Sequence, residues 1–254
     1  MIKENAVVIS QEKIASGIYS LVLGVTFAEE AVPGQFVSVY CRDASRLMPR
    51  PISLCEIFPD RGAVRLVYRV AGAGTEEFSR LHSGETAEIM GPLGNGFPIE
   101  ENRDKKVLLI GGGIGIPPLL ACAEKLSHPV FAVGYRSETY LLADLKKAGQ
   151  VHAATEDGSY GICGNVMDVI CSVPLEADVI FACGPKPMLK AVKAYAEKNA
   201  IECWISMEER MACGIGACLG CVCKTTEINS HSMVRNARVC KDGPVFKAGE
   251  VDLS

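Results

Sequence analysis

The residues best suited to chemistry are four cysteines in the last quarter of the chain. Cys213, Cys218 and Cys221 follow a C-x4-C-x2-C spacing, and eighteen residues separate Cys221 from Cys240. With this spacing four thiolates can hold a [2Fe–2S] cluster, three of them supplied by one tight loop. Interleaved glycines fit such a loop, because a residue without a Cβ lets the backbone bend sharply and aim its N–H groups at sulfur.

Two other interpretations of these cysteines stay open. Four thiolates also suit a tetrahedral Zn²⁺ ion, although zinc sites usually pair their ligands as two separate C-x2-C units. The cysteines could instead be small buried residues that bind nothing. Cys223 has no place in the cluster pattern, and we interpret it as a spare thiol.

The composition is that of a globular protein. The chain has 254 residues, enough for two domains and a small third one, and 48% are hydrophobic against 22% charged. The net charge of −4 is small. The sequence has no run of basic residues of the kind that would indicate nucleic-acid binding. Twelve cysteines without a secretory signal predict free thiols and metal ligation in a reducing cytoplasm. Residues 107–123 carry no charge, but their glycines and prolines favour a strand, a turn and a buried helix over a membrane span.

Residues 1–99 are predicted to form a small antiparallel β-barrel. Short β-branched and aromatic runs alternate there with turn signals and indicate strands. In one run Val64, Leu66, Tyr68 and Val70 alternate with other residues and are expected to share a face. The predicted strands lie at 18–23, 35–40 and 64–70.

Two segments of this part carry residue types that suit a dinucleotide. Arg50-Pro51-Ile52-Ser53 places a planar cation and a hydroxyl on an extended segment, which suits the pyrophosphate of a flavin nucleotide. Gly72-Ala73-Gly74-Thr75 opens a short predicted helix, where free N–H groups favour a phosphate. Each segment alone is weak evidence, since Arg-Pro usually ends a solvated strand and a glycine pair usually forms a turn.

Residues 100–206 are predicted to form a parallel sheet covered by helices on both faces, because strand and helix patterns alternate along them. A charged linker, 100–106, precedes the first strand. The predicted strands are 107–110, 129–133, 151–154, 178–182 and 202–206, the last being final, and the predicted helices are 117–126, 141–147, 166–171 and 186–199.

Two turns at the ends of these strands suit a pyridine dinucleotide. Gly111-Gly112-Gly113-Ile114-Gly115 follows the first strand and opens the first helix, whose N-terminus favours a pyrophosphate. The run continues into Pro117-Pro118, where the commoner fingerprint has glycine. Cys183-Gly184-Pro185 follows the fourth strand, at the edge where open α/β sheets bind ligands. Standing alone, this tripeptide would be interpreted as a tight turn.

Together these motifs resemble those of the ferredoxin–NADP⁺ reductase superfamily over nearly the whole chain. Arg50–Ser53, with Ile52 where many members have Tyr, and Gly72–Thr75 match its flavin motifs. Gly111–Pro118 and Cys183–Met188 match its pyridine-nucleotide motifs. The C-terminal segments 208–218 and 239–246 are similar to those of the electron-transfer subunits of NAD-dependent dihydroorotate dehydrogenases.

The resemblance implies a β + α/β fold in three parts. These are an FAD-binding antiparallel barrel over 1–99, an NAD-binding parallel-sheet domain over 100–206 and a small [2Fe–2S] domain over 207–254. It implies a cluster on Cys213, Cys218, Cys221 and Cys240. It implies FAD held by Arg50, Pro51, Ile52, Ser53, Val67, Tyr68, Arg69, Gly74 and Thr75, and NAD held by Gly111, Gly112, Gly113, Gly115, Cys183, Gly184 and Pro185.

The resemblance also implies a function and a partner. The partner is an FMN-containing dihydroorotate dehydrogenase catalytic subunit, with two copies of each chain in the complex. Electrons would run from its FMN through the cluster and FAD to NAD⁺, in pyrimidine biosynthesis. No acid–base residue of this chain has to act.

Two alternatives remain at this stage. A subunit of a ferredoxin:NAD(P)⁺ or sulfide-type oxidoreductase would carry much the same motifs, and Arg136 and Ser137 could meet the 2′-phosphate of NADP. A zinc-stabilised interaction module is an alternative of another class. His231 and the other histidines are expected at the surface.

Overall fold

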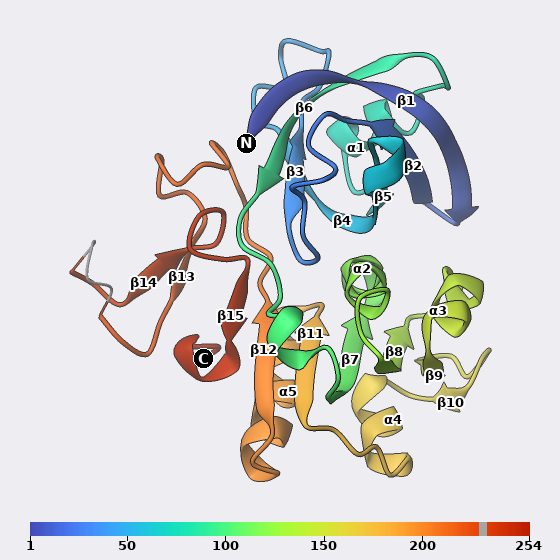
Figure 1. Ribbon diagram of the computed structural model, residues 1–254, viewed down its shortest axis with the longest axis vertical. Helices are drawn as coiled ribbons and strands as arrows, with labels where there is room; N and C mark the ends of the chain where they lie inside the picture. Colours follow the sequence, from blue (N-terminus) through green and yellow to red (C-terminus); the bar gives the residue numbers. More distant parts are fainter. Residues whose placement is uncertain (229–232) are drawn as a thin grey trace.

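The computed structural model describes residues 1–228 and 233–254, so His231 lies outside the described residues. Its first part is a closed barrel of six strands in the order β1-β2-β5-β4-β3-β6, with antiparallel neighbours (Figure 1). The predicted antiparallel barrel is therefore confirmed. Its elements are β1 (Ile2–Ala15), β2 (Ile18–Gly24), β3 (Phe36–Val39), β4 (Arg50–Phe58), η1 (Pro59–Arg61), β5 (Ala63–Arg69), α1 (Ala73–Phe78) and β6 (Thr86–Leu93).

Alternation along the strands fills the barrel. Val64, Leu66 and Tyr68 of β5 lie in the barrel core, and Val70 packs against it, so the predicted face is correct. Val67, on the other face of β5, belongs to the apolar cluster shared with the next part of the chain. The barrel is thereby fixed to the parallel sheet through the outer face of this strand.

The middle of the chain forms the predicted parallel sheet, in which β10-β9-β8-β7-β11-β12 are consecutive parallel neighbours. Two apolar clusters pack its two faces, one with α2 and α3 and the other with α4 and α5 (Figure 1). The elements are η2 (Glu100–Asn102), β7 (Lys106–Gly112), η3 (Gly113–Gly115), α2 (Pro117–Ala123), β8 (His128–Tyr135), α3 (Leu142–Ala148), β9 (Gln150–Thr155), β10 (Ile162–Cys163), α4 (Val166–Ser172), β11 (Val179–Cys183), α5 (Lys186–Lys198) and β12 (Glu202–Ser206).

The sheet does not end at β12, contrary to the prediction that 202–206 is its final strand. β15 (Val245–Lys247) returns from the C-terminal part and pairs antiparallel with β12. It satisfies backbone groups that β12 would otherwise expose at the edge of the sheet. The rest of this part is the hairpin of β13 (Val222–Lys224) and β14 (Asn236–Arg238), together with η4 (Ala248–Glu250).

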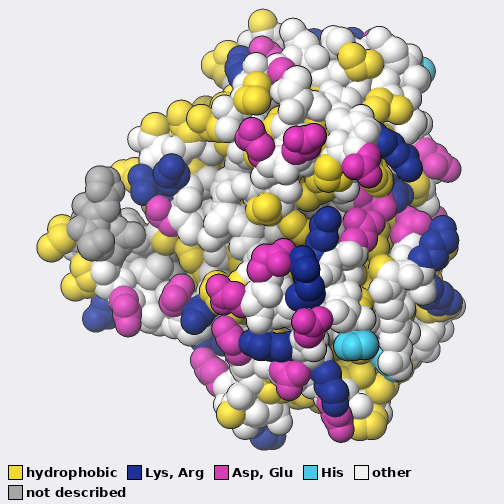
Figure 2. Space-filling view, viewed as in Figure 1, with side chains coloured by type: hydrophobic (Ala, Val, Ile, Leu, Met, Phe, Trp, Pro, Cys, Tyr) yellow, Lys and Arg dark blue, Asp and Glu magenta, His cyan; other side chains and the backbone are white. Residues whose placement is uncertain are grey.

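The surface carries charges of both signs. On the face shown in Figure 2, acidic and basic side chains are interspersed over the lower part of the molecule. None of the helices within the described residues is long and apolar enough to cross a lipid bilayer. Residues 107–123 instead form the predicted buried strand, turn and helix, as β7, η3 and α2.

Candidate cofactor sites

A cleft of about 890 Å³ lies where the barrel, the parallel sheet and the segment after β12 meet. This volume is within the range of small-molecule and cofactor sites. The structure brings most of the predicted FAD residues and some of the predicted NAD residues to its walls. These are Arg50, Pro51, Ile52, Ser53, Val67, Tyr68, Arg69, Thr75, Gly115, Cys183 and Gly184.

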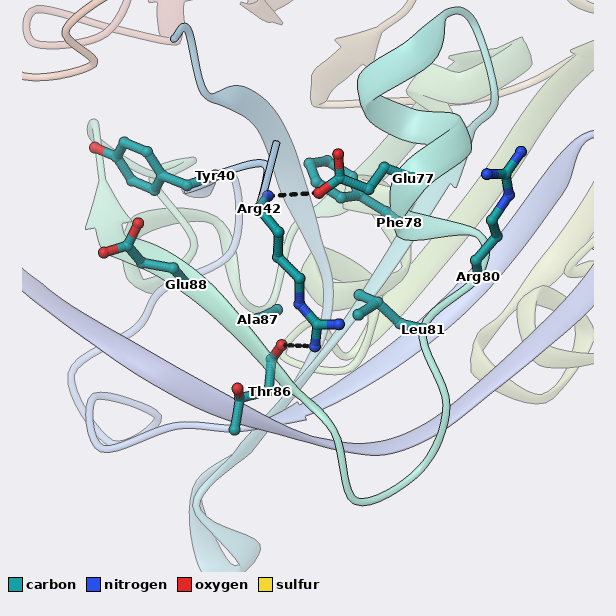
Figure 3. A pocket seen from close by; sticks show the side chains of 9 residues that line it. All are labelled: Tyr40, Arg42, Glu77, Phe78, Arg80, Leu81, Thr86, Ala87 and Glu88. Carbon is teal, nitrogen blue, oxygen red and sulfur yellow. Dashed lines mark hydrogen bonds between the residues drawn. The ribbon is translucent and has the colours of Figure 1, made fainter. Parts of the chain in front are cut away.

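A smaller hollow of about 160 Å³ lies between α1 and β6. Figure 3 shows Arg42 crossing it: its backbone N–H donates to Glu77 at 2.5 Å and its guanidinium to the Thr86 carbonyl at 2.8 Å. The hollow is smaller than usual cofactor sites, and its described lining holds none of the predicted cofactor residues. The larger cleft is therefore the candidate site.

One wall of the cleft is the start of β4. Antiparallel pairing with β3 sets Arg50 opposite Val39 and Pro51 opposite Ser38, which fixes where the predicted flavin motif lies. The Arg50 side chain reaches Gly74 in α1, where a Cβ would stand 2.7 Å from Arg50 Nε. Glycine at 74 thus leaves room for the guanidinium, which can meet a phosphate as a planar fork.

The end of β5 and the start of α1 form a neighbouring wall. The Thr75 hydroxyl donates to the Gly72 carbonyl at 3.0 Å and so shapes the glycine loop. The Tyr68 ring is buried in the barrel, stacked on Tyr19 with 5.9 Å between ring centroids, and its hydroxyl donates to Gln11 at 3.1 Å. Tyr68 therefore offers a ligand its main chain rather than its hydroxyl.

The turns after β7 and β11 pack tightly against each other. A Cβ on Gly115 would lie 2.3 Å from the Cys183 carbonyl oxygen, and one on Gly112 would lie 2.6 Å from Met188 Sδ. These contacts bring Gly115, Cys183 and Gly184 to the cleft. The structure does not bring the other predicted NAD residues to its wall, and they lie behind it or beside it: Gly111, Gly112, Gly113 and Pro185.

The Cys183 thiol has little nucleophilic character. Burial raises its pKa to about 12, and a hydrogen bond with Ser206 only partly opposes this rise. Because the thiolate is the reactive form, Cys183 is a poor nucleophile at neutral pH. Its place at the cleft wall suits a contact with a ligand and not a covalent step.

The cysteine loop aims backbone N–H groups at sulfur, as the glycine spacing predicts. Cys213 Sγ accepts from the N–H groups of Ala217 at 3.3 Å and of Cys218 at 3.4 Å. Gly214 and Gly216 have φ of +70° and +85°, values that a residue with a Cβ adopts at a cost. The loop therefore has the backbone shape that four thiolates around a cluster require.

The hairpin β13–β14 brings the fourth cysteine to the loop. The Cys240 N–H donates to Cys221 Sγ at 3.4 Å, and Cys240 Sγ accepts from the Gly216 N–H at 3.1 Å. The Arg238 guanidinium, paired with Asp242 at 2.9 Å, also donates to the Gly216 carbonyl at 3.2 Å. Arg238 thus holds the segment that leads from β14 to Cys240 against the cysteine loop.

Backbone hydrogen bonds link the four cysteines in two pairs: the Cys218 N–H donates to Cys213 Sγ, and the Cys240 N–H donates to Cys221 Sγ. In the described part of the chain, no three His, Cys, Asp or Glu side chains are placed to ligate one ion. Two pairs of sulfurs facing N–H donors fit a group with two irons.

Electrostatics at the loop favours a thiolate at Cys213. Burial alone would raise its pKa, but N–H groups of the loop outweigh burial and lower the pKa to about 6. Cys240 is more buried and its pKa is raised to about 12, first by burial and then by Cys221. Cys223 faces the apolar core with a pKa raised by burial to about 11, in agreement with its interpretation as a spare thiol.

Several cleft residues escaped the sequence interpretation. Ser206 ends β12 at the edge of the sheet where ligands bind. Its position at the carboxyl end of a predicted parallel strand is a signal that could have identified it. Phe36 and Met48 gave no such signal, because neither their type nor their spacing is special, whereas Ile114 and Pro244 lie inside motif segments without having been singled out as site residues. The segment 207–212 and Gly220 also line the cleft, which makes the cysteine loop one of its walls.

Known proteins share this arrangement. A family model described as the iron–sulfur cluster binding domain of dihydroorotate dehydrogenase B matches residues 208–252, which include all four cysteines. A solved structure of an NADH-dependent reduced ferredoxin-NADP oxidoreductase is 28% identical, with a TM-score of 0.86 over 98% of this chain and 90% of that one. The iron–sulfur match leaves the zinc interpretation without support.

Relatives of the same length narrow the assignment. A protein of Geobacillus kaustophilus is 42% identical over 99% of both chains, and one of Listeria monocytogenes is 42% identical over 100% of both. Each is named dihydroorotate dehydrogenase B (NAD(+)), electron transfer subunit. Full-length similarity at this level, with the iron–sulfur match, means that the chain belongs to the family of dihydroorotate dehydrogenase B electron transfer subunits.

Proposed function

We propose that this protein is the electron-transfer subunit of a dihydroorotate dehydrogenase and passes electrons between a catalytic partner subunit and NAD⁺. One observation carries the proposal: a single cleft is lined by both candidate nucleotide sites and by the cysteine loop. Ala212 and Gly220, which are adjacent to Cys213 and Cys221, face the same cleft as Arg50 and Cys183. Cofactors held by these residues would lie beside one another.

Each part of the chain holds one group in this proposal. Residues 1–99 hold FAD through the β4 wall and the Gly74-Thr75 loop, residues 207–254 hold the cluster through the four cysteines, and residues 100–206 hold NAD. When bound, the cluster exchanges single electrons and the flavin exchanges single electrons or pairs, which joins a one-electron donor to nicotinamide hydride chemistry. The chain binds and orients these groups, and its Cys183 thiol stays protonated.

The partner is a catalytic subunit that carries FMN, with two copies of each chain in the complex. The cysteine loop supports this part of the proposal, because Ile215 and Leu219 are 42% and 57% exposed beside the cluster ligands. Exposed apolar side chains of this kind are typical of a protein contact. We place the complex in the cytoplasm, since none of the twelve cysteines forms a disulfide and a reducing compartment keeps thiols in that state.

The test is spectroscopic and then kinetic. The anaerobically purified chain should contain FAD and acid-labile sulfide, and with its FMN-containing partner it should reduce NAD⁺ only when dihydroorotate is added. Assays with reduced ferredoxin, sulfide and NADP⁺ examine the alternative oxidoreductases in the same preparation. A protein with both cofactors that accepts electrons from ferredoxin and never from the dihydroorotate partner would contradict the proposal.

A further inference from the structure

Ser38 carries a buried hydroxyl that the fold leaves unpaired. It lies in β3, is fully buried, and its Oγ has no hydrogen-bond partner among the described residues. An unpaired buried hydroxyl is unfavourable because it has lost its hydrogen bonds to water, so a partner is expected in the working protein.

The strand pattern decides which way this hydroxyl points. Val37 and Val39 belong to the barrel core, so the side chain between them faces out of the barrel. Phe36, on the same face as Ser38, packs in the apolar cluster that includes Cys221 and Cys240. Ser38 therefore faces the C-terminal part of the chain.

The cysteine loop covers this hydroxyl. A Cβ on Gly214 would lie 2.9 Å from Ser38 Oγ, 3.4 Å from Leu93 and 3.6 Å from Met90. Gly214 directly follows Cys213, and the loop passes beside β6 in Figure 1. Ser38 itself is not part of the cleft lining, although its neighbour Phe36 is. The hydroxyl therefore faces the cysteine loop and not the flavin cleft.

We propose that the Ser38 hydroxyl donates a hydrogen bond to sulfur on the Cys213 side of the bound [2Fe–2S] cluster and raises its reduction potential. This inference rests on the proposed function. Reduction adds one negative charge to the cluster, and a donor directed at sulfur stabilises that charge. The apolar surroundings strengthen the interaction, because a hydrogen bond in a low dielectric is electrostatically stronger than in water. Ser38 would contact the cluster directly and tune its reduction potential from a strand of the barrel.

The experiment is an EPR-monitored redox titration of the cluster in the complete complex. Ser38→Ala should make the reduced cluster about tenfold less populated at a given potential, a shift of about 59 mV toward negative values for one electron. Ser38→Cys, a weak donor of similar size, should give a smaller shift in the same direction. Pulsed EPR in D2O should lose one exchangeable deuteron coupling in Ser38→Ala.

Ser20→Ala is the matched control, because it removes a buried barrel hydroxyl that instead accepts from Arg65 at 2.8 Å. It should leave the cluster potential unchanged, and the FAD potential should stay constant in Ser38→Ala. A cluster whose potential and deuteron couplings are the same in Ser38→Ala and the unaltered protein would overturn this inference alone. An unaltered protein without acid-labile sulfide would overturn the proposed function as well.

Discussion

At the scale of one residue, the Arg50 side chain is the group expected to bind the FAD pyrophosphate. Its guanidinium lines the cleft beside Gly74, where it can meet a pyrophosphate with two parallel hydrogen bonds. Arg50→Ala should weaken FAD binding about tenfold to a hundredfold, since hydrogen bonds to charged groups contribute about 1.5–3 kcal/mol. Titration of the FAD-free protein by flavin fluorescence measures this. Arg61→Ala, which removes a cation over the Phe58 ring away from the cleft, is the control. Equal FAD affinities of the two variants would show that Arg50 does not bind FAD.

Gly115 tests how closely the two nucleotide turns must pack. Gly115→Ala would place a methyl group 2.3 Å from the Cys183 carbonyl oxygen, which forces the turns apart. The expected cost is about 1–3 kcal/mol of unfolding free energy, together with weaker NADH binding and an unchanged flavin spectrum. Urea unfolding and NADH titration measure these effects. Gly249→Ala, whose new methyl group meets nothing within 4 Å, should lie close to the unaltered protein. An equal loss of unfolding free energy in both variants would mean that the turn at Gly115 has room for a methyl group.

At the scale of elements, Arg238 holds the end of the β13–β14 hairpin against the cysteine loop. It bonds both Asp242 and the Gly216 carbonyl, and only about a fifth of its side chain is exposed, 22%. Arg238→Ala should therefore release the cluster several-fold faster under a chelator, with FAD retained, because the approach to Cys240 loses its anchor. Loss of the visible iron–sulfur absorption with time reports the rate. The control is Arg80→Ala, which breaks an exposed i,i+4 pair with Glu76 on the barrel. Identical rates in the two variants would show that the hairpin keeps its place without Arg238.

Elements differed in how far the sequence revealed them. Most of the parallel strands were predictable because they are largely apolar runs that alternate with helix patterns, and the cysteine spacing predicted the loop geometry directly. β10 was not predicted, because its two residues, Ile162 and Cys163, give no period. β1 was missed because charged and polar residues interrupt its pattern: Lys3, Glu4, Asn5, Glu12 and Lys13. β15 was missed because three residues give no period, and only its pairing with β12 makes it a strand. Ser38 could not be singled out at all, since its significance depends on its contact with Gly214, which lies far along the chain.

At the scale of the whole molecule, a seam of charged groups joins the barrel to the nucleotide sheet. Arg65 of β5 bonds Glu56 of β4 at 2.5 Å and Asp144 of α3 at 3.1 Å. Glu124, at the end of α2, brings another carboxyl to Glu56. One guanidinium thus bonds two carboxylates, one from each part of the chain, and Glu124 adds a third carboxyl group beside Glu56. The seam has more negative than positive charge when all of them are ionised, so its stability depends on a proton.

That proton is expected on Glu124. Burial, and next the Glu56 carboxylate, raise the pKa of Glu124 from its ordinary 4.5 to about 7. Between these values the folded protein binds a proton that the unfolded chain releases, so the free energy of unfolding falls as the pH rises from 4.5 to 7. Glu124→Gln should remove this loss and be more stable than the unaltered protein above pH 7 by about 1 kcal/mol, a small figure because solvent reaches part of this carboxyl and screens it. Urea unfolding at several pH values across this window checks the slope, with Glu101→Gln on the exposed linker as the control. Parallel pH profiles for Glu124→Gln and the unaltered protein would place the proton elsewhere. A difference in the free energy of unfolding that grows with pH would show that protonation of Glu124 stabilises the contact between the barrel and the sheet.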